Sequence, residues 1–511
     1  MDRRSIFNHS MFLKKPLASK GGMTKDTPSL KRVLKPIDLV MLGVGGIIGT
    51  GIFVLSGVAA GLHAGNALPL SFIIAGTVCL FAALCYAEFS TMIPVAGSAY
   101  TYSYTALGEI WAWIIGWTLI LEYGLAISAV AIGWSGYMHA LVTVAGINLP
   151  ASLIQPYGVD GGILNLPAVL IVLALTLLLV KGTKESVRMN SVIVVIKIAV
   201  ILLFILLSVT AINPGNWAPL MPPNGWLGVF SGAAVVFFAF IGFDAVVTAA
   251  EEIEDPQKTL PIGLIGSLVV CMILYIIVGV VLTGVVPFAE LARPEAIDAP
   301  IAYALNSIGI SWGAAIVSFG ALAGMTSVML VMLFGQSRIF FAMSRDGLLP
   351  TFFSKVNPVT HTPSKSILFI GIVTACVAGL FPLATVAELV NMGTLVAFAI
   401  VALGVLVLRH RQPELKRPFR CPLVPYVPLL CIGTCGFLIL NLKPLAHLMF
   451  VVWLGIGLVV YFIYGVRHSE NRRGIMNDGP RPVPGHVAIE SPVPGLAEIN
   501  VLSVIVADPD K

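Results

Sequence analysis

Long apolar segments dominate the sequence and leave few folds open to it. Twelve segments are long enough to cross a lipid bilayer: residues 36–60, 67–93, 109–141, 163–181, 188–212, 226–250, 261–286, 311–342, 365–382, 385–408, 424–442 and 446–466. About 20 residues cross the hydrocarbon core, so the two longest segments should tilt or extend beyond the lipid. Because 58% of the residues are hydrophobic and only 11% are charged, no soluble core can hide this much apolar surface. The sequence therefore predicts an all-α integral membrane protein with twelve transmembrane helices.

The basic residues are distributed unevenly between the two sides of such a protein. With twelve spans, both chain ends lie on one side, and this side holds 27 of the 30 Lys and Arg residues. The other side holds only Arg293 and Lys443. Cytosolic segments of membrane proteins are rich in Lys and Arg, so we expect a multi-pass protein of the cell (inner) membrane with both termini cytosolic. Residues 1–35 form a basic tail, and residues 467–511, rich in Pro and Gly, form a mostly disordered tail.

Several classes of function are disfavoured by the sequence. The gathering of basic residues on one side of the membrane explains the net charge of +5, so this charge does not indicate a nucleic-acid partner. The seven cysteines stand singly, with no CxxC pair and no His cluster, which indicates thiols rather than disulfides or a zinc site. Titratable residues inside the spans are few and no HExxH pattern occurs, so we expect no catalytic residue, no metal and no cofactor. A channel would need a continuous polar lining, which the segments lack.

Two of the apolar segments contain residues that interrupt a helix. The stretch GVGGIIGTGIF (residues 43–53) has five glycines among eleven residues, and each glycine costs a helix interior about 1 kcal/mol. The stretch FFAFIGFDAVV (237–247) places Gly242 and Asp244 in the middle of a span. Unwound backbone is tolerated at membrane depth only where it faces protein or a water-filled cavity. Close packing of helices on small residues explains one such stretch as well, but less readily two in matching positions.

The positions of the interruptions suggest what they bind. The interrupted segments are the first and the sixth, each the first of a set of five helices, which is typical of inverted-repeat transporters. The half-helix N-termini attract a carboxylate, and exposed carbonyls attract an ammonium group. The α-amino acid zwitterion carries both groups. We therefore expect a first repeat over residues 36–212, a second over 226–408, and two additional helices over 424–466.

Four stretches of the sequence resemble the amino acid–polyamine–organocation superfamily, in particular the bacterial relatives of the cationic amino acid transporters. These are LKPIDLVMLGVGGIIGTGIF (34–53), CYAEFSTMIPVAGSAYTYSY (85–104), FFAFIGFDAVVTAAEEIEDPQKTLPIG (237–263) and FAMSRDGLLP (341–350). They occur in both halves of the chain. The resemblance implies the leucine-transporter fold, alternating access and transport of L-amino acids.

The resemblance also implies a substrate site, residue by residue. The carboxylate and part of the ammonium would meet backbone groups of Ile47, Gly49, Thr50 and Gly51. Carbonyls of the second interruption would meet the ammonium, from Phe238, Ala239 and Ile241. Either Phe238 or Phe240 would act as an aromatic lid, and Met325 of GALAGMTSV would shape the side-chain pocket.

Lys197 lies about ten residues into the fifth segment. A lysine at the centre of a span costs about 3 kcal/mol, so we favour a functional role over a side chain that reaches the membrane surface. The resemblance implies a role for Lys197. In proton-coupled relatives, a lysine at the matching place takes the position of a bound cation and donates to the unwound carbonyls of the first segment. Lysines in apolar surroundings exchange protons readily, so the coupling ion is expected to be H⁺.

Two acidic residues also lie inside spans. Glu122 in the third segment pairs with Lys197, senses protons, or is satisfied by nearby backbone. Asp244 is an N-cap of the second half of its helix, a carboxylate near the substrate ammonium, or both. The sequence leaves these alternatives open.

The combined expectation is a proton-coupled secondary transporter of L-amino acids that works as a monomer in the bilayer. An exchanger or facilitator without proton coupling, and an amino acid sensor that does not transport, are the alternatives. Small neutral substrates such as alanine are expected first and arginine or lysine second, because the pocket segments offer few acidic groups. The sequence leaves open whether a small single-span accessory protein accompanies the chain.

Overall fold

The computed structural model describes residues 34–469, with gaps at 93–97, 145, 148, 160, 182–186, 221–223, 249, 251–252 and 358–361. Most of both expected tails, residues 1–33 and 470–511, lies outside the described residues. The described residues are mainly helical and contain no β-strand; a single parallel bridge pairs Leu34 with Ile253.

The first part of the chain contains helices α2 to α9. The helices are α2 (Pro36–Ile47), α3 (Ser56–Ala59), α4 (Leu68–Met92), α5 (Ser98–Ala106), α6 (Glu109–Val144), α7 (Ala151–Ile154), α8 (Leu166–Val180) and α9 (Val187–Ser208). Between α2 and α4 the chain also forms two π-helical turns, Gly51–Leu55 and Ala60–Ala64, and a 3-10 turn, Gly65–Ala67. Two further 3-10 turns, Val209–Ala211 and Pro214–Trp217, follow α9.

The second part begins with α10. Its helices are α10 (Gly225–Val236), α11 (Ala245–Thr248), α12 (Pro256–Val285), α13 (Phe288–Leu291), α14 (Pro294–Ile297), α15 (Pro300–Ser307), α16 (Ser311–Arg345), α17 (Ser364–Leu380), α18 (Leu383–Arg411), α19 (Tyr426–Leu440), α20 (Pro444–Val460) and α21 (Val466–His468). A 3-10 turn, Phe237–Phe240, follows α10; another, Thr351–Ser354, follows α16; and a π-helical turn, Tyr461–Gly465, joins α20 to α21.

Many of these helices suit a membrane by length and composition. Among the described residues, seven helical runs are long and apolar enough to cross a bilayer, and five shorter apolar helices accompany them: α2, α8, Gly225–Phe240, α17 and α19. The two longest, α6 with 36 residues and α16 with 35, extend about 50 Å at 1.5 Å per residue. They exceed a hydrocarbon core of about 30 Å, as their sequence predicts.

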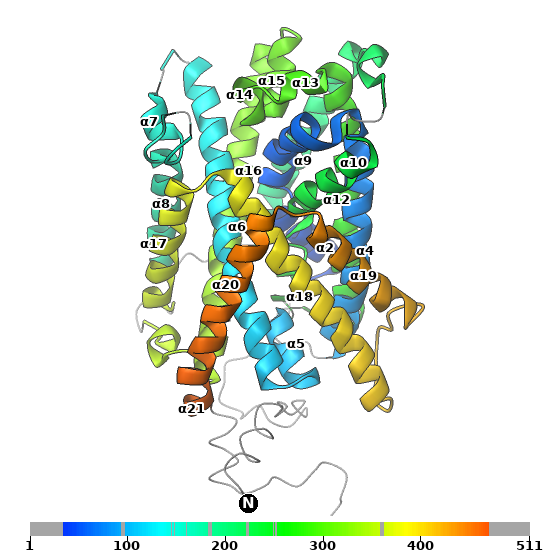
Figure 1. Ribbon diagram of the computed structural model, residues 1–511, viewed down its shortest axis with the longest axis vertical. Coiled ribbons are helices and arrows are strands. Elements are labelled where there is room, and N and C mark those ends of the chain that lie inside the picture. The colour runs from blue at the N-terminus through cyan, green and yellow to red at the C-terminus, as the bar shows by residue number, and fades with distance from the viewer. Residues whose placement is uncertain are drawn as a thin grey trace, which may run out of the picture.

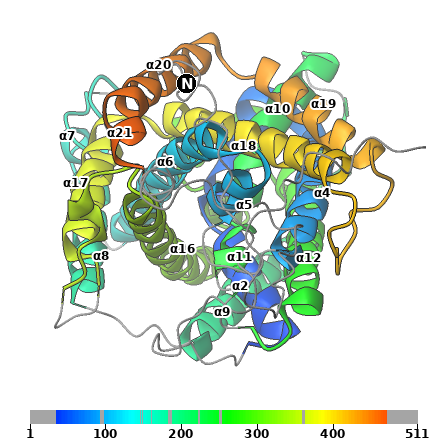
Figure 2. The same ribbon diagram turned by 90° about the horizontal axis from the view of Figure 1, so that it is seen from below.

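The long helices surround the two interrupted ones. In the view of Figure 2, α2 and α11 lie toward the centre, with α6, α16, α12, α4 and α18 around them. Helix α16 packs along α6, and α12 packs along both α4 and α2. Helices α8 and α17 lie side by side at one edge of the bundle, and α20 crosses its outer face (Figure 1). The two interruptions are therefore shielded from the outer wall.

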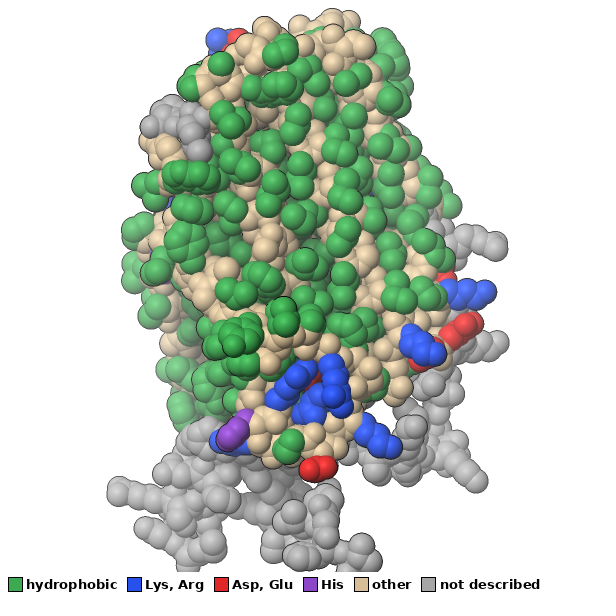
Figure 3. All heavy atoms as spheres, turned by 90° about the vertical axis from the view of Figure 1, so that its right-hand side faces the viewer, with side chains coloured by type: hydrophobic (Ala, Val, Ile, Leu, Met, Phe, Trp, Pro, Cys, Tyr) green, Lys and Arg blue, Asp and Glu red, His purple; other side chains and the backbone are tan. Residues whose placement is uncertain are grey.

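The outer wall of the bundle is apolar. Figure 3 shows hydrophobic side chains over most of one face, with Lys and Arg side chains gathered toward one end. Large exposed side chains include Leu206 on α9, Phe319 on α16 and Leu440 on α19. Such a surface is expected against lipid and is too extensive for water. We call the end that holds Arg345, Arg409 and Arg467 the basic end.

Candidate functional site

The first interruption separates α2 from the helical turns that follow it. Helix α2 ends at Ile47, and Ile48 is extended, with φ −74° and ψ 100°. The Phe53 N–H donates the next backbone hydrogen bond, to the Gly49 carbonyl at 3.3 Å. The N–H groups of residues 49–51 therefore stand at a helix N-terminus, where amides lack an intrahelical acceptor and attract anions.

Side chains from other helices bind the carbonyls at the end of α2. The buried Lys197 of α9 donates from Nζ to the Gly45 carbonyl at 2.7 Å. The Tyr275 hydroxyl of α12 lies 3.1 Å from the Ile47 carbonyl and 3.0 Å from the Ala239 carbonyl of the second interruption. The contact expected of Lys197 with a carbonyl of the first segment is thus present, and its role in coupling stays a prediction. One lysine and one tyrosine occupy acceptors that a continued helix would have used.

The second interruption follows α10. After the 3-10 turn Phe237–Phe240 the chain becomes extended at Ile241, and Gly242 has a φ of 112°. Asn391 of α18 donates from Nδ2 to the Ala234 carbonyl at 2.7 Å, near the end of α10. Asp244 directly precedes α11, the position of an N-cap, and its Oδ2 accepts from the Tyr123 hydroxyl at 3.0 Å.

The two interruptions touch through glycines. A Cβ on Gly51 would overlap the backbone of Ala239, and a Cβ on Gly242 would lie 2.7 Å from the Gly46 carbonyl oxygen. Position 242 requires glycine for two reasons. Its positive φ disfavours any side chain, and the surrounding atoms leave no room for one. Close contact of the two unwound segments therefore accounts for glycine at both positions.

A small cavity lies where the two interruptions meet. Its volume is about 20 Å³, room for about one water molecule, and its walls are Gly46, Ile47, Gly49, Thr50, Gly51, Ala126, Val130, Phe238, Ile241, Val328 and Met332. None of these residues is charged. Residues of both interruptions form part of its wall, and the wall residues that come from α6 and α16 are apolar.

Six of the residues predicted for the substrate site line this cavity: Ile47, Gly49, Thr50, Gly51, Phe238 and Ile241. The ring of Phe240 instead packs against Phe72 and Tyr275, with ring centroids 6.3 and 5.2 Å apart. Of the two residues considered for the lid, Phe238 lines the cavity, and the role of a lid stays a prediction. The Ala239 carbonyl accepts from the Tyr275 hydroxyl, and Ala239 is not among the wall residues of the cavity.

Met325 is displaced from the position expected for it. It is fully buried, and its Sδ lies 3.2 Å from the Thr50 hydroxyl, behind the cavity wall. Val328 and Met332, one and two turns further along α16, line the cavity in its place. Residues three, four and seven positions apart share one helix face, so this displacement follows from the helical period.

Glu122 does not pair with Lys197, and that alternative is wrong. Its buried carboxylate interacts electrostatically with Asp244 and lies beside Thr394 of α18. Its Oε2 has no hydrogen-bond partner, so neighbouring backbone leaves this oxygen unsatisfied. Two acidic residues thus lie together between α6 and the second interruption, whereas Lys197 belongs to the first. A proton-sensing role for Glu122 stays a prediction.

Sequence reasoning missed five residues of the cavity wall, four of which come from continuous helices. Ala126 and Val130 belong to α6, Val328 and Met332 to α16, and Gly46 to the last turn of α2. No local signal marks an alanine or valine in an apolar span as a wall residue. Within the described residues, no three His, Cys, Asp or Glu side chains converge as metal ligands would.

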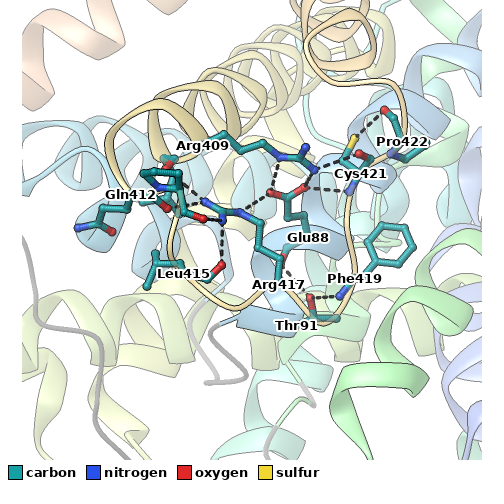
Figure 4. Close-up of polar contacts among 11 residues, drawn as sticks. Glu88, Thr91, Arg409, Gln412, Leu415, Arg417, Phe419, Cys421 and Pro422 are labelled. Carbon is teal, nitrogen blue, oxygen red and sulfur yellow. Dashed lines mark hydrogen bonds and ion pairs between the residues drawn. The ribbon is translucent and has the colours of Figure 1, made fainter.

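An ion-pair cluster fastens the chain at the basic end (Figure 4). Glu88 of α4 accepts from Arg409 at 2.7 and 3.1 Å and lies 3.3 Å from Nε of Arg417. It also accepts from the Cys421 N–H at 2.8 Å. The Cys85 thiol and burial raise the pKa of the Cys421 thiol, and all seven cysteines are free. The cluster ties the connection between α18 and α19 to α4, well apart from the cavity.

Comparison with known proteins gives consistent matches. Residues 34–477 match the sequence model of the family described as "Amino acid permease". The chain is 52% identical to "Branched-chain amino acid permease BcaP" of Bacillus subtilis (strain 168) over 464 residues, which cover 90% of this chain and 99% of the relative.

Two further relatives carry other substrates in their names. The chain is 48% identical to "Methylthioribose transporter" of Bacillus subtilis (strain 168), over 90% of this chain and 99% of the relative. It is 39% identical to "Cationic amino acid transporter 4, vacuolar" of Arabidopsis thaliana, over 80% of this chain and 68% of the relative. The family and these relatives are permeases and transporters, not enzymes. With a match that spans nearly all of the described residues, the chain belongs to the amino acid permease family, a branch of the amino acid–polyamine–organocation superfamily of membrane transporters.

Proposed function

We propose that the chain is a proton-coupled, alternating-access transporter of neutral L-amino acids that binds its substrate between the two helix interruptions. The observation that carries the proposal is the cavity at their contact. There, the amides of residues 49–51 lie at a helix N-terminus and carbonyls end both α2 and the 3-10 turn. The first group suits a carboxylate and the second suits an ammonium.

The architecture proposed for this activity has twelve spans. The seven long helical runs and the five shorter apolar helices would form two inverted five-helix repeats, 36–212 and 226–408, with α19 and α20 added. Lys and Arg side chains gather at the basic end, which supports a cytosolic location for that end and for both termini. The chain would act as a monomer in the cell membrane.

Lys197 is the group proposed to couple transport to protons. It is fully buried, and its ammonium holds the last turn of α2 through the Gly45 carbonyl. When the ammonium loses its proton, the charge that binds this carbonyl is lost, so the first interruption becomes easier to rearrange. Substrate binding at the adjacent amides would then favour one protonation state over the other.

The cavity walls support neutral substrates over cationic ones. No charged residue lines the cavity, and the wall beside the interruptions consists of Ala126, Val130, Val328 and Met332. An apolar wall favours an aliphatic side chain, since a buried guanidinium or ammonium needs a partner. A branched-chain relative at 52% identity supports the same choice. The present cavity admits about one water molecule, so substrate entry requires the walls to move apart.

Transport of methylthioribose is the second candidate. The relative with that name is 48% identical over nearly its whole length. An uncharged cavity accepts a thioether as well as an aliphatic side chain, but such a ligand has neither carboxylate nor ammonium for the interrupted helices.

Uptake by the reconstituted protein tests these proposals together. Liposomes containing the protein take up labelled L-leucine or L-alanine with and without an inward proton gradient, and unlabelled leucine, alanine, arginine and methylthioribose compete. Accumulation above equilibrium that requires the gradient, with neutral amino acids as the strongest competitors, supports the proposal. Uptake only against preloaded amino acid makes the protein an exchanger. Competition by methylthioribose alone favours the second candidate.

A further inference from the structure

A second cavity lies between the outer halves of the interrupted helices. We call it the outer cavity; its volume is about 30 Å³, and its walls include Leu55, His63, Val235, Glu388, Asn391 and Lys443. Leu55 follows the first interruption, and Val235 lies in the last turn of α10, just before the second. Glu388 and Asn391 belong to the first turns of α18, which runs toward the basic end at Arg411. The outer cavity is thus on the opposite side of the central cavity from the basic end.

The outer cavity contains one opposite-charge pair. Lys443 Nζ lies 2.9 Å from Glu388 Oε1; the side chain of Glu388 is 10% exposed and that of Lys443 is 60% exposed. His63 interacts electrostatically with Lys443, and its Nδ1 lies 3.2 Å from the Ser231 hydroxyl. One charge is therefore fixed inside the cavity, while the other sits on a flexible side chain that reaches toward the surface.

Asn391 adds an unused acceptor. Its Nδ2 donates to the Ala234 carbonyl at 2.7 Å and lies 3.5 Å from the Val235 carbonyl. Since both partners are acceptors, the amide nitrogen must face them, and this fixes the orientation of the amide. Its Oδ1 is then directed elsewhere, is buried, and has no hydrogen-bond partner. Asn391 itself is fully buried, and a buried acceptor of this kind is normally paired.

We infer that the outer cavity is a first binding site for zwitterionic amino acids on their way to the central cavity. The substrate ammonium binds Glu388 Oε1 and Asn391 Oδ1, and the substrate carboxylate binds Lys443. The exchange replaces one ion pair by two and leaves the net charge of the cavity unchanged. Each charged group leaves water only when it meets an opposite charge, which limits the desolvation penalty.

The site is connected to the central cavity through Asn391. The same side chain that offers Oδ1 to the ammonium holds the carbonyls of Ala234 and Val235, just before the turn that carries Phe238. A ligand on Asn391 therefore contacts the group that fixes the end of α10. This inference rests on the proposed function, because it assigns a second site for the same substrate.

Kinetics of uptake from outside test the site. Vesicles with the outer face exposed take up labelled L-leucine through the wild type, Glu388→Gln, Lys443→Gln and the double exchange Glu388→Lys/Lys443→Glu. We expect KM to rise about tenfold in each single variant, the loss of one charge-assisted contact, with kcat retained. The exchange variant restores the ion pair but not the KM, because Asn391 Oδ1 then faces the substrate carboxylate. Glu290→Gln, on α13 and outside the residues that line the cavity, keeps the wild-type KM.

Other outcomes overturn the inference. An unchanged KM in both single variants means that the cavity binds no substrate. A raised KM that the exchange variant returns to the wild-type value means that the ion pair only fastens α20 to α18. Thermal melting of each variant identifies unfolding, and Lys443→Gln, at a mostly exposed side chain, provides a variant that folds. If the wild type takes up no labelled amino acid, the proposed function fails instead.

Discussion

Both helix interruptions leave backbone carbonyls without a partner in their own helix, and different kinds of group bind these carbonyls. At the first, the Gly45 carbonyl binds the charged Lys197 at 2.7 Å; at the second, the Ala234 carbonyl binds the neutral Asn391 at the same distance. The Tyr275 hydroxyl lies within 3.1 Å of a carbonyl from each. The Gly45 carbonyl therefore depends on a group that can change its charge, whereas the Ala234 carbonyl depends on a neutral amide. Under the proposed coupling, proton sensitivity at the end of α2 would depend on Lys197, whereas the end of α10 would respond through packing and through its neutral hydrogen bonds.

Removing the charge at the first interruption should have the largest effect. In Lys197→Met, accumulation of amino acid driven by a proton gradient should fall to background, because the Gly45 carbonyl loses its charged donor. Liposome uptake with and without the gradient measures this. Lys258→Met removes the same charge from a side chain that is 84% exposed and should leave uptake unchanged. Undiminished accumulation in Lys197→Met would contradict the proposed coupling.

The second interruption should be most sensitive at its glycine. In Gly242→Ala the new Cβ meets the Gly46 carbonyl oxygen at 2.7 Å and the residue must hold a φ of 112°, so we expect a loss of about 3 kcal/mol in stability. Thermal melting in detergent measures it. Gly225→Ala also has a positive φ, 55°, but no atom within 4 Å of the Cβ; it should cost about 1 kcal/mol. Equal losses in the two variants would refute the close contact between the interruptions.

Removing the shared hydroxyl should weaken both interruptions without abolishing coupling. Tyr275→Phe leaves the Ile47 and Ala239 carbonyls without this donor, at a cost of about 1–3 kcal/mol. We expect KM for leucine to rise while uptake still requires the proton gradient, since Lys197 is unchanged. Comparing uptake at several concentrations, with and without the gradient, separates the two effects. Loss of gradient dependence in Tyr275→Phe would mean that coupling is not confined to Lys197.

The smallest effects are expected from substitutions of two neighbouring phenylalanines in the second interruption. Phe238 lines the cavity, whereas Phe240 packs against Phe72 and Tyr275. Phe238→Leu should change the KM for leucine a few-fold and barely change thermal stability. Phe240→Leu should lower thermal stability and leave KM nearly unchanged. The reverse pattern would return the lid to Phe240.

Much of this protein is determined by neighbouring residues in the sequence. The apolar segments predict the helices closely: segment 67–93 becomes α4 (Leu68–Met92), and segment 226–250 becomes α10, a turn and α11. The glycines of residues 43–53 and Gly242 mark the interruptions, because the cost of glycine in a helix and the need for a positive φ are local properties. The burial of Lys197 was predictable for the same reason, since a charge in the middle of an apolar segment must find a partner.

The tertiary structure alone decided which side chains meet. Ala126, Val130, Val328 and Met332 line the cavity, Glu122 lies beside Asp244, and Asn391 joins the outer cavity to α10. In a soluble helix the apolar stripe reveals the buried face. In this chain lipid-facing and protein-facing residues are equally apolar, because lipid replaces water at the outer wall. The sequence therefore determined where helices form and break, whereas their rotation and packing, which only the folded bundle fixes, decided which residues form the sites.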